Sequence, residues 1–406
     1  MVSPAGLCII CKGSRNLCGK GFCPYLTRTI IKPKIEKIID KEFFGPSVSV
    51  FVGRSGYPNI WIGPMTMLEE KPEIDNPKTW FGMDYEKIIE LRSLLLRSKH
   101  KQNIRSSSKF VQETQELALA SKPTDIEAIF FRKPVYRISF SEVLQPMGPT
   151  AVLEKMRITE NPRIPAHIER IVSDELKAQE AGFLLYKHGH DVYKISTILS
   201  SGVLGRDEKK LVPTRWSITA VDNIIFLNLI QEIKEFPSIS EYMVYSSEFL
   251  DNRFEILLIP GNWEYENFEA WAPGSFWAFS LKKPEILEEY EPFQGRKDYA
   301  ETQGGGYYAA RLAVAEGLYR MKKQARVVVF REVYEGYVIP LGVWQVRENV
   351  RNAFRNKPAK FDNLGEALKH IASRLRIPME EYINRSKILR QKRLYDFYIS
   401  SETLTL

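Results

Sequence analysis

Cysteine is absent from the sequence beyond residue 23, although the chain runs to 406 residues. This absence excludes a disulfide framework for most of the protein. No apolar run approaches the length of a membrane-spanning helix, and no basic segment with an apolar core opens the chain. We therefore expect a cytoplasmic protein with no membrane partner, in which the thiols stay reduced.

Signatures of familiar enzyme classes are missing as well. The sequence contains no nucleophile elbow, no zinc-protease helix and no deaminase motif. With 44% hydrophobic and 27% charged residues, the composition is that of an ordinary globular protein. The net charge of +8 suits a nucleic-acid partner but does not require one, because many proteins carry such a surplus for solubility.

Short strands and medium-length helices follow one another irregularly, which predicts an α+β fold and not a regular βαβ repeat. Residues 48–53 and 59–63 have the pattern of two strands joined by a Gly-Tyr-Pro turn. Apolar residues at helical spacing predict a helix over 84–99, and the polar residues 99–109 predict a loop. A further strand is expected over 276–281.

The uneven cysteine distribution marks residues 1–30 as a small separate module. A proline- and charge-rich passage after residue 281 marks an interior boundary. We therefore expect an α+β domain over 31–281 and a second domain over 282–384. The remaining residues, 385–406, form a tail whose first part contains basic residues and lacks acidic ones.

The four cysteines follow the pattern Cys8-x2-Cys11-x6-Cys18-x4-Cys23. Two close thiols and two more across a short loop can converge on one tetrahedral metal ion, and zinc is the usual ion for four thiolates in a structural site. Because so small a module cannot build a core, the metal would supply its folding free energy. An iron–sulfur cluster also takes four cysteines and remains the alternative cofactor.

The C-terminal segment contains Gln391, then Leu394 three positions on, then the adjacent aromatics Phe397 and Tyr398. One turn of 3₁₀ helix would bring the three apolar side chains to one side as a plug for a hydrophobic pocket. This pattern predicts a peptide that docks onto a DNA sliding clamp (PCNA), with the glutamine amide in a second, polar pocket. The alternative is a terminal helix packed on its own domain, whose single face would not take two adjacent aromatics.

Arg215 and Trp216 are candidates for nucleic-acid contact, because a guanidinium can hold a phosphate and an indole offers a face to a base. The competing interpretation is a helix entry, with Thr219 as the N-cap and Asp222 in the first turn. Arg54, beside the Gly-Tyr-Pro turn, is a further anion-binding candidate.

Acidic and aromatic residues alternate over 263–271. Glu264 and Glu266 are therefore weak catalytic candidates, together with Arg215 and Asp222, because clustered carboxylates can bind Mg²⁺ or act as acid and base. A half-exposed strand produces the same alternation without any catalytic role.

A run of glycines, including Gly305 and Gly306, precedes a helix predicted over 307–323. Free amide groups there would cradle an anion with Arg311 beside them, although a flexible turn explains the glycines equally well. His188 and His190 form the only close histidine pair, and no third metal ligand accompanies them in the sequence.

The four-cysteine cluster, the C-terminal peptide and the internal stretches 52–58, 211–219 and 260–266 together resemble the archaeal Nre family of DNA repair proteins. The resemblance covers essentially the whole chain. It implies two domains, a zinc finger in front, a clamp-binding motif behind, and a role on DNA that would place the protein at the nucleoid. It implies no established reaction.

Two hypotheses remain for the body of the protein. In one it is an enzyme on damaged nucleic acid, such as a metal-dependent nuclease or a nucleotide-handling enzyme. In the other it is a non-catalytic adaptor that binds DNA at the clamp. Convergence of Arg215, Glu264, Glu266 and Arg311 in one cleft would favour the enzyme, and their dispersal would favour the adaptor.

Overall fold

The computed structural model describes residues 4–11, 13, 15–138, 145–206, 208–275 and 277–391. The chain divides into two compact units, of which the first comprises residues 1–230 and 338–348 and the second residues 231–337 and 349–406. Both units contain helices and strands, which confirms the predicted α+β class. Among the described residues, none of the helices combines the length and the apolar character that a bilayer crossing needs.

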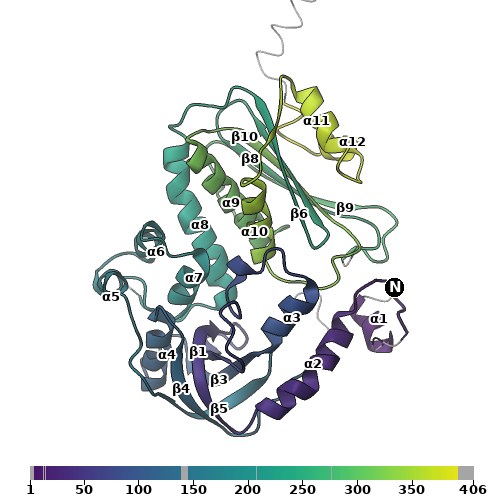
Figure 1. The fold of residues 1–406 in the computed structure, drawn as a ribbon. Coiled ribbons are helices and arrows are strands. Elements are labelled where there is room, and N and C mark those ends of the chain that lie inside the picture. The colour runs from purple at the N-terminus through teal and green to yellow at the C-terminus, as the bar shows by residue number, and fades with distance from the viewer. Residues whose placement is uncertain are drawn as a thin grey trace, which may run out of the picture. The chain divides into compact units, whose positions relative to one another are not determined.

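A closed barrel lies at the centre of the first unit, as the purple and blue strands of Figure 1 show. Its strands are β1 (Glu42–Val52), β2 (Asn59–Met67), β3 (Leu95–Asn103), β4 (Thr124–Phe130) and β5 (Thr150–Ile158). They are ordered β1-β2-β3-β5-β4, and only β3 and β5 pair in parallel. Helix α4 (Lys109–Leu119) connects β3 to β4. This strand order, with the helix in this connection, is the topology of the OB-fold barrel.

Strand β1 pairs with two different neighbours, which closes the barrel. Its first half pairs with β4 and its second half with β2, and the register shifts between Ser47 and Ser49. A bulge at this point bends the strand from one partner to the other. The interior is apolar, with side chains from α4 packed against those of the strands.

The helix predicted over 84–99 is too long. Helix α3 (Tyr85–Ser93) begins at its N-cap Asp84 and ends at Ser93, and the chain continues as β3. The loop expected over 99–109 is therefore wrong for residues 99–103, which belong to β3. Leu96 is fully buried in the barrel core, so burial in a strand outweighs the helical spacing of the leucines.

Helix α2 is held to the same unit by Arg28, whose guanidinium donates to the Tyr136 hydroxyl (3.4 Å) and to the Arg137 carbonyl (2.9 Å). The remaining helical segments of this unit are α1 (Pro4–Cys11), α2 (Pro24–Ile38), η1 (Pro77–Thr79), α5 (Ala166–Ser173), α6 (Ala178–Lys187) and α7 (Val192–Ser200). Helices α8 (Thr214–Ile233) and α10 (Trp344–Ala353) each begin in the first unit and end in the second.

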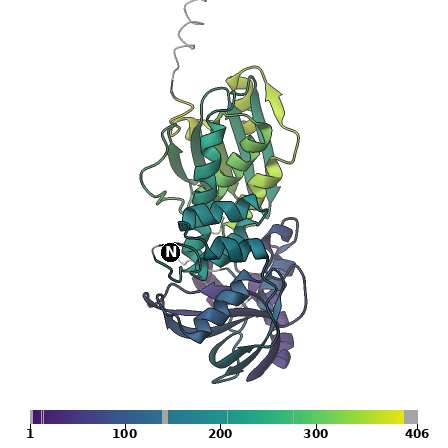
Figure 2. The ribbon, with the colours of Figure 1, turned by 90° about the vertical axis from the view of Figure 1, so that its left-hand side faces the viewer.

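The second unit is built on a six-stranded sheet in the order β11-β6-β7-β10-β8-β9. The strands are β6 (Tyr242–Phe249), β7 (Asn252–Ile259), β8 (Glu264–Trp271), β9 (Glu285–Glu291), β10 (Arg326–Val333) and β11 (Ala359–Phe361). Helix α9 (Gly305–Met321) covers one face, and α11 (Leu364–Ala372) with α12 (Met379–Ile383) covers the other (Figures 1 and 2). The sheet takes strands from both sides of residue 281, where the sequence predicts a boundary.

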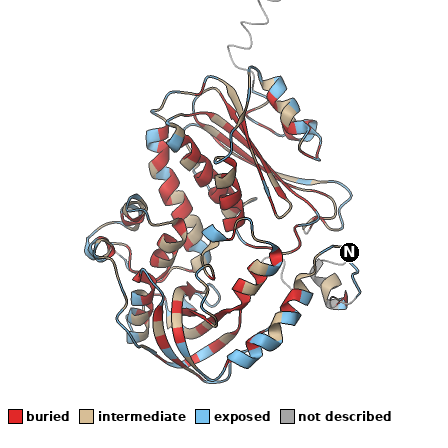
Figure 3. Ribbon diagram, in the orientation of Figure 1, coloured by how far each residue is buried: buried red, intermediate tan, exposed pale blue. Residues whose placement is uncertain are grey.

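Both faces of this sheet are buried, and α9 is buried along most of its length (Figure 3). The strand expected over 276–281 is wrong for the described residues 277–281, which form turns. Trp277 explains the turn, because its ring packs against Trp271 and Tyr337 at centroid distances of 5.1 and 5.4 Å. Ring packing fixes this segment in place of a strand ladder.

Candidate nucleic-acid interface

Two stretches that are far apart in the sequence meet at one end of the barrel. The turn between β1 and β2 covers residues 53–58, and α8 begins at Thr214. The Val52 backbone N–H at the end of β1 donates to the Thr214 hydroxyl over 2.9 Å. This bond places the first turn of α8 beside the β1–β2 turn.

Two aromatic rings lie together and exposed at this meeting point. The rings of Tyr57, from the turn, and Trp216, from α8, have their centroids 5.4 Å apart at an interplanar angle of 49°. Tyr57 is 46% exposed and Trp216 is 47% exposed. Large aromatics held at the surface in this way offer ring faces to a ligand.

Arg54 lies in the same turn as Tyr57, and Arg215 is adjacent to Trp216. Both arginines are exposed, and neither forms an ion pair with any described residue. The structure therefore brings the three predicted nucleic-acid candidates of this unit to one region. Sequence reasoning missed Tyr57, although its position in a Gly-Tyr-Pro turn, where an aromatic ring has little to pack against, was a usable indication.

The predicted helix entry at Thr219 is wrong, because α8 begins five positions earlier and Thr219 lies inside it. Asp222 is fully buried and forms a two-point ion pair with Arg347, with contacts of 3.0 Å to Nε and 2.5 Å to the terminal nitrogen. The Asp222 carboxylate is thus committed to a structural pair, and a partner this distant in the chain gave no signal in the sequence.

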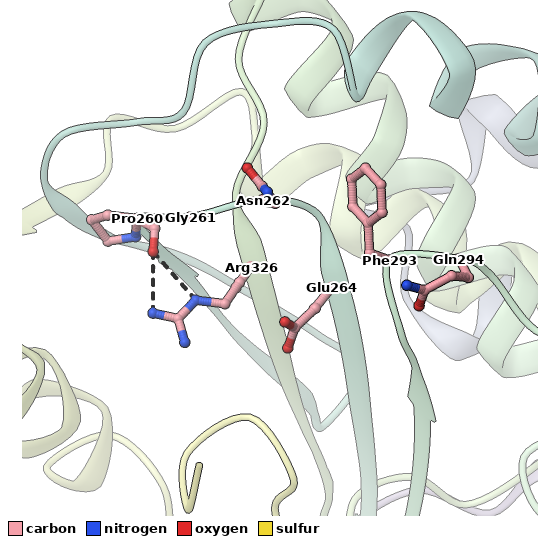
Figure 4. Close-up of a pocket in the computed structure, with 7 residues that line it drawn as sticks. All are labelled: Pro260, Gly261, Asn262, Glu264, Phe293, Gln294 and Arg326. Carbon is pink, nitrogen blue, oxygen red and sulfur yellow. Dashed lines mark hydrogen bonds between the residues drawn. The ribbon is translucent and has the colours of Figure 1, made fainter. Parts of the chain in front are cut away.

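The second unit contains an open pocket of about 470 Å³ that includes the candidate Glu264 (Figure 4). Arg326 lines the same pocket and pairs in register with Glu264 on the neighbouring strand. The Arg326 guanidinium donates to the Pro260 carbonyl at 3.1 and 3.2 Å. A side chain at Gly261 would come within 2.9 Å of this guanidinium, so the glycine is required where the loop turns.

Glu266 lies on the same face of β8 but is sealed by the C-terminal segment. Its carboxylate accepts hydrogen bonds from the backbone N–H groups of Lys387 (2.6 Å) and Ile388 (3.4 Å), and from the Ser386 hydroxyl. Burial raises the pKa of Glu266 to about 7, and the neighbouring carboxylate of Glu288 acts in the same direction. The group anchors the chain just ahead of the predicted clamp peptide.

The glycine run opens α9, but the space above it is filled. A Cβ at Gly306 would lie 3.4 Å from a carboxylate oxygen of Glu269, which pairs with Arg331 at 2.5 Å. Arg311 is buried and forms an ion pair with Glu291, which also accepts from the Tyr307 hydroxyl at 3.0 Å. The protein's own carboxylates thus lie where the sequence suggested a bound anion.

The candidates of the second unit do not converge. Glu264 and Glu266 alternate on the face of β8 that packs with the C-terminal segment, whereas Arg311 pairs on the opposite face, under α9. Sequence reasoning also missed Arg326, whose position opposite Glu264 depends on strand pairing.

The four cysteines lie on α1, in the turn that follows it and at the start of α2. Cys8 and Cys11 belong to α1, Cys23 is the N-cap of α2, and no disulfide joins any of the four. Burial raises the pKa of the Cys8 thiol, and so do the nearby thiols of Cys18, Cys23 and Cys11. The Cys8 sulfur therefore lies within electrostatic range of the other three, although no three metal-binding side chains of the described residues stand in a finished coordination geometry.

Backbone amides surround the Cys11 sulfur. The N–H of Leu17 does most to lower the pKa of the Cys11 thiol, against the effect of burial, and the N–H groups of Arg15 and Gly13 assist. Amide donors directed at a sulfur favour its thiolate form, which is the form that binds metal.

The predicted clamp peptide falls largely outside the described residues. Gln391 is the last residue that the structure describes, and Leu394, Phe397 and Tyr398 lie beyond it. The expectation that these residues bind a sliding clamp stays a prediction.

The histidine pair acquires a third member, His167 from α5. Its Nε2 lies 2.7 Å from Nε2 of His190, so one ring donates to the other, and His188 stacks on it at 4.9 Å. Burial lowers the pKa of His190, and His167 adds to the effect. The three rings form a hydrogen-bonded cluster, and the described residues contain no group arranged to hold a metal ion.

Comparison with known proteins covers nearly the whole chain. The family model "Archaeal Nre, N-terminal" matches residues 17–278, and "Archaeal Nre, C-terminal" matches residues 291–397. The DNA repair proteins NreA and NreB of Archaeoglobus fulgidus are 38% and 37% identical to the chain, over 96% of its length and 98% and 99% of theirs. DNA repair protein NreA of Haloferax volcanii is 34% identical over 88% of this chain and 89% of its own. No solved structure matches. The chain belongs to the archaeal Nre family.

Proposed function

We propose that this protein acts in DNA repair, as the names of its relatives indicate for them. In this proposal the first unit contacts DNA, the C-terminal peptide tethers the protein to the sliding clamp, and the four cysteines hold zinc. The observation that carries the proposal is the pairing of Tyr57 with Trp216 on the surface, flanked by Arg54 and Arg215.

The geometry supports an adaptor over an enzyme. Asp222, Glu266 and Arg311 are each buried against partners that the fold itself supplies. A catalytic acid, base or metal ligand must instead face a cleft that the substrate enters. Glu264 does line a pocket, but Arg326 beside it already donates to a backbone carbonyl.

The arrangement of the cysteines favours a zinc site over four unrelated thiols. The Cys8 sulfur lies within electrostatic range of the other three, and amide donors surround the Cys11 sulfur, as a closed tetrathiolate site would need. The bound ion would replace the mutual repulsion of the thiolates with a common attraction and so hold α1 to the start of α2. Its chemistry there would be structural.

Metal analysis of the purified protein tests the zinc assignment. We expect about one zinc ion per chain, and Cys11→Ser should abolish it while the barrel keeps its cooperative unfolding. Lys20→Ala, which leaves the thiols in place, is the matched control. A brown protein that contains iron in place of zinc would assign the cysteines to an iron–sulfur cluster.

A peptide of residues 388–400 tests the tether. It should bind the clamp with micromolar-range affinity, because a few anchors must offset the cost of ordering a free segment. Phe397→Ala with Tyr398→Ala should abolish binding in the full chain without changing its thermal unfolding. Lys392→Ala with Arg393→Ala should slow association and keep the complex. Unchanged clamp binding by the double aromatic variant would refute the tether.

A further inference from the structure

We infer that the ligand of the first unit is single-stranded DNA, and that it runs from the Tyr57–Trp216 ring pair onto the outer face of β2 and β3. This inference rests on the proposed DNA contact and specifies its substrate. The barrel strip, as we call this surface, comprises Tyr57, Trp61, Lys101 and Trp216.

The register of the barrel places two of these residues side by side. Trp61 on β2 is paired with Lys101 on β3. Ile60 and Ile62, on either side of Trp61, point into the core, so the Trp61 ring lies on the outer face. Lys101 is exposed and Trp61 is partly exposed. An aromatic ring therefore stands beside a cation on the barrel surface, a few residues along β2 from the exposed ring pair.

The charge along these strands has one sign. No acidic residue occurs from Leu91 to Gln112, a stretch that contains six basic residues, and none occurs from Phe43 to Leu68. The six basic residues are Arg92, Arg97, Lys99, Lys101, Arg105 and Lys109. Lys101 is the exposed cation of this set that forms no ion pair with the described residues, and no acidic residue of β2 or β3 opposes its attraction for a polyanion.

Contacts within the barrel show where the strip ends. Arg97 stacks over the ring of Phe51 at 4.9 Å and reaches the sulfur of Met147 at 2.8 Å. Both Phe51 and Met65 are buried on this part of the outer face. The segment around Met147 therefore covers the far end of β3, and the accessible part lies between Trp61 and the β1–β2 turn.

The aromatic groups decide between single and double strands. Stacking of unpaired bases on exposed aromatic rings is favourable. The bases of a duplex are already stacked and paired within the double helix and are not free to stack on the protein. β2 begins at Asn59, so Trp61 lies about 7 Å along the strand from its first residue at about 3.3 Å per residue, and Tyr57 lies in the turn just ahead of it. Rings at both ends of this path and a cation beside one of them suit a short unpaired strand.

Fluorescence anisotropy with the full chain tests the inference, using a labelled strand of about 15 thymidines and a duplex of equal length. We expect tighter binding to the single strand. Tyr57→Ala and Trp216→Ala should each weaken it about tenfold with little change in salt dependence. Lys101→Ala should reduce the slope of log affinity against log salt by about 0.7.

Controls come from the opposite end of β1. Phe44→Ala removes a 65% exposed ring, and Lys41→Ala removes an exposed cation, and neither should affect binding. Equal affinity for duplex and single strand, or unchanged binding in Trp216→Ala, would overturn the inference while DNA binding stood. Absence of any DNA binding at low salt would instead refute the proposed function beneath it.

Discussion

The two units use their charged residues in opposite ways. In the sheet unit, carboxylates and guanidinium groups lie inside the fold with partners, and Glu255, Glu266, Glu332, Arg311 and Arg331 are all buried. In the barrel unit, Arg54, Lys101 and Arg215 are exposed and form no ion pair with the described residues. A charge that the fold has already satisfied cannot serve a ligand, so the second set is the more informative about function.

The most deeply buried ion pair described in the barrel unit runs against this contrast, and substituting one of its partners should have the largest effect of the variants considered. Asp222 and Arg347 are 0% and 1% exposed. Asp222→Ala would leave a buried guanidinium without its carboxylate and should lower the free energy of unfolding by about 3–5 kcal/mol. Urea-induced unfolding measures this.

The double variant Asp222→Leu with Arg347→Met is the control for that prediction. It replaces the whole pair with apolar groups, so it should cost clearly less than the single change. A double variant as unstable as the single one would show that the pair is needed for more than the mutual neutralisation of its charges.

Glu332 represents the buried charges of the sheet unit. Its carboxylate accepts from the hydroxyl of Tyr382 (2.7 Å), the hydroxyl of Tyr334 (2.6 Å) and the N–H groups of Arg376 and Ile377. Glu332→Ala would leave these donors without an acceptor and should destabilise the protein by about 3 kcal/mol in urea unfolding.

Glu335 provides the comparison for Glu332, because its ion pair with Arg376 lies at the surface, with side chains 50% and 57% exposed. Glu335→Ala should cost less than about 1 kcal/mol. Similar losses for the two variants would contradict the distinction between buried and exposed charges.

The pH dependence of stability should follow Glu266. Its pKa is about 7 in the folded protein, above the ordinary value of about 4.3. The folded state therefore holds the proton more tightly than the unfolded chain. Its stabilising effect is complete below the unfolded pKa and is lost as pH rises through about 7.

This loss should amount to about 3 kcal/mol between pH 4.5 and pH 8, measured by urea unfolding across the range. Glu266→Gln mimics the neutral form and should flatten the profile. The pH at which the Ser386–Ile388 contacts loosen would also be the pH at which the C-terminal segment is released. A variant that keeps the wild-type slope would assign the pH dependence to another group.

Sequence patterns predicted local structure and missed what depends on pairing. Strands β1 and β2 and the turn between them were expected, because alternation and turn residues are local. Strand β3 was mistaken for helix and loop, because the run of leucines from Leu94 to Leu96 is compatible with a helix or a strand. Only pairing in the barrel selects the strand. The barrel itself, which needs β3 to pair with β5 about fifty residues later in the chain, left no local trace.

The same limit applies to the candidate site. Arg215 and Trp216 stood out by residue type, whereas Tyr57, Trp61 and Lys101 joined them only through a turn contact and a strand register. Glu266 looked catalytic in the sequence because nothing there shows that the chain returns to cover it 121 residues later.

The smallest expected effect concerns Glu208, a carboxylate close to the basic strands. It accepts from Arg105 (2.9 Å to Nε) at the end of β3 and from Lys210 (2.9 Å). All three side chains are well exposed, so Glu208→Gln should change the free energy of unfolding by less than about 1 kcal/mol.

Binding should respond where stability does not. The change frees Arg105 and Lys210 to meet phosphates and removes a repelling charge, so affinity for a single strand should rise a few-fold at low salt and the salt dependence should steepen. Glu127→Gln, which breaks the exposed pair with Arg157 on β4 and β5, is the matched control and should leave binding unchanged. Equal gains in the two variants would mean that net charge alone attracts DNA. A gain confined to Glu208→Gln would locate the attraction at the end of β3, next to Lys101.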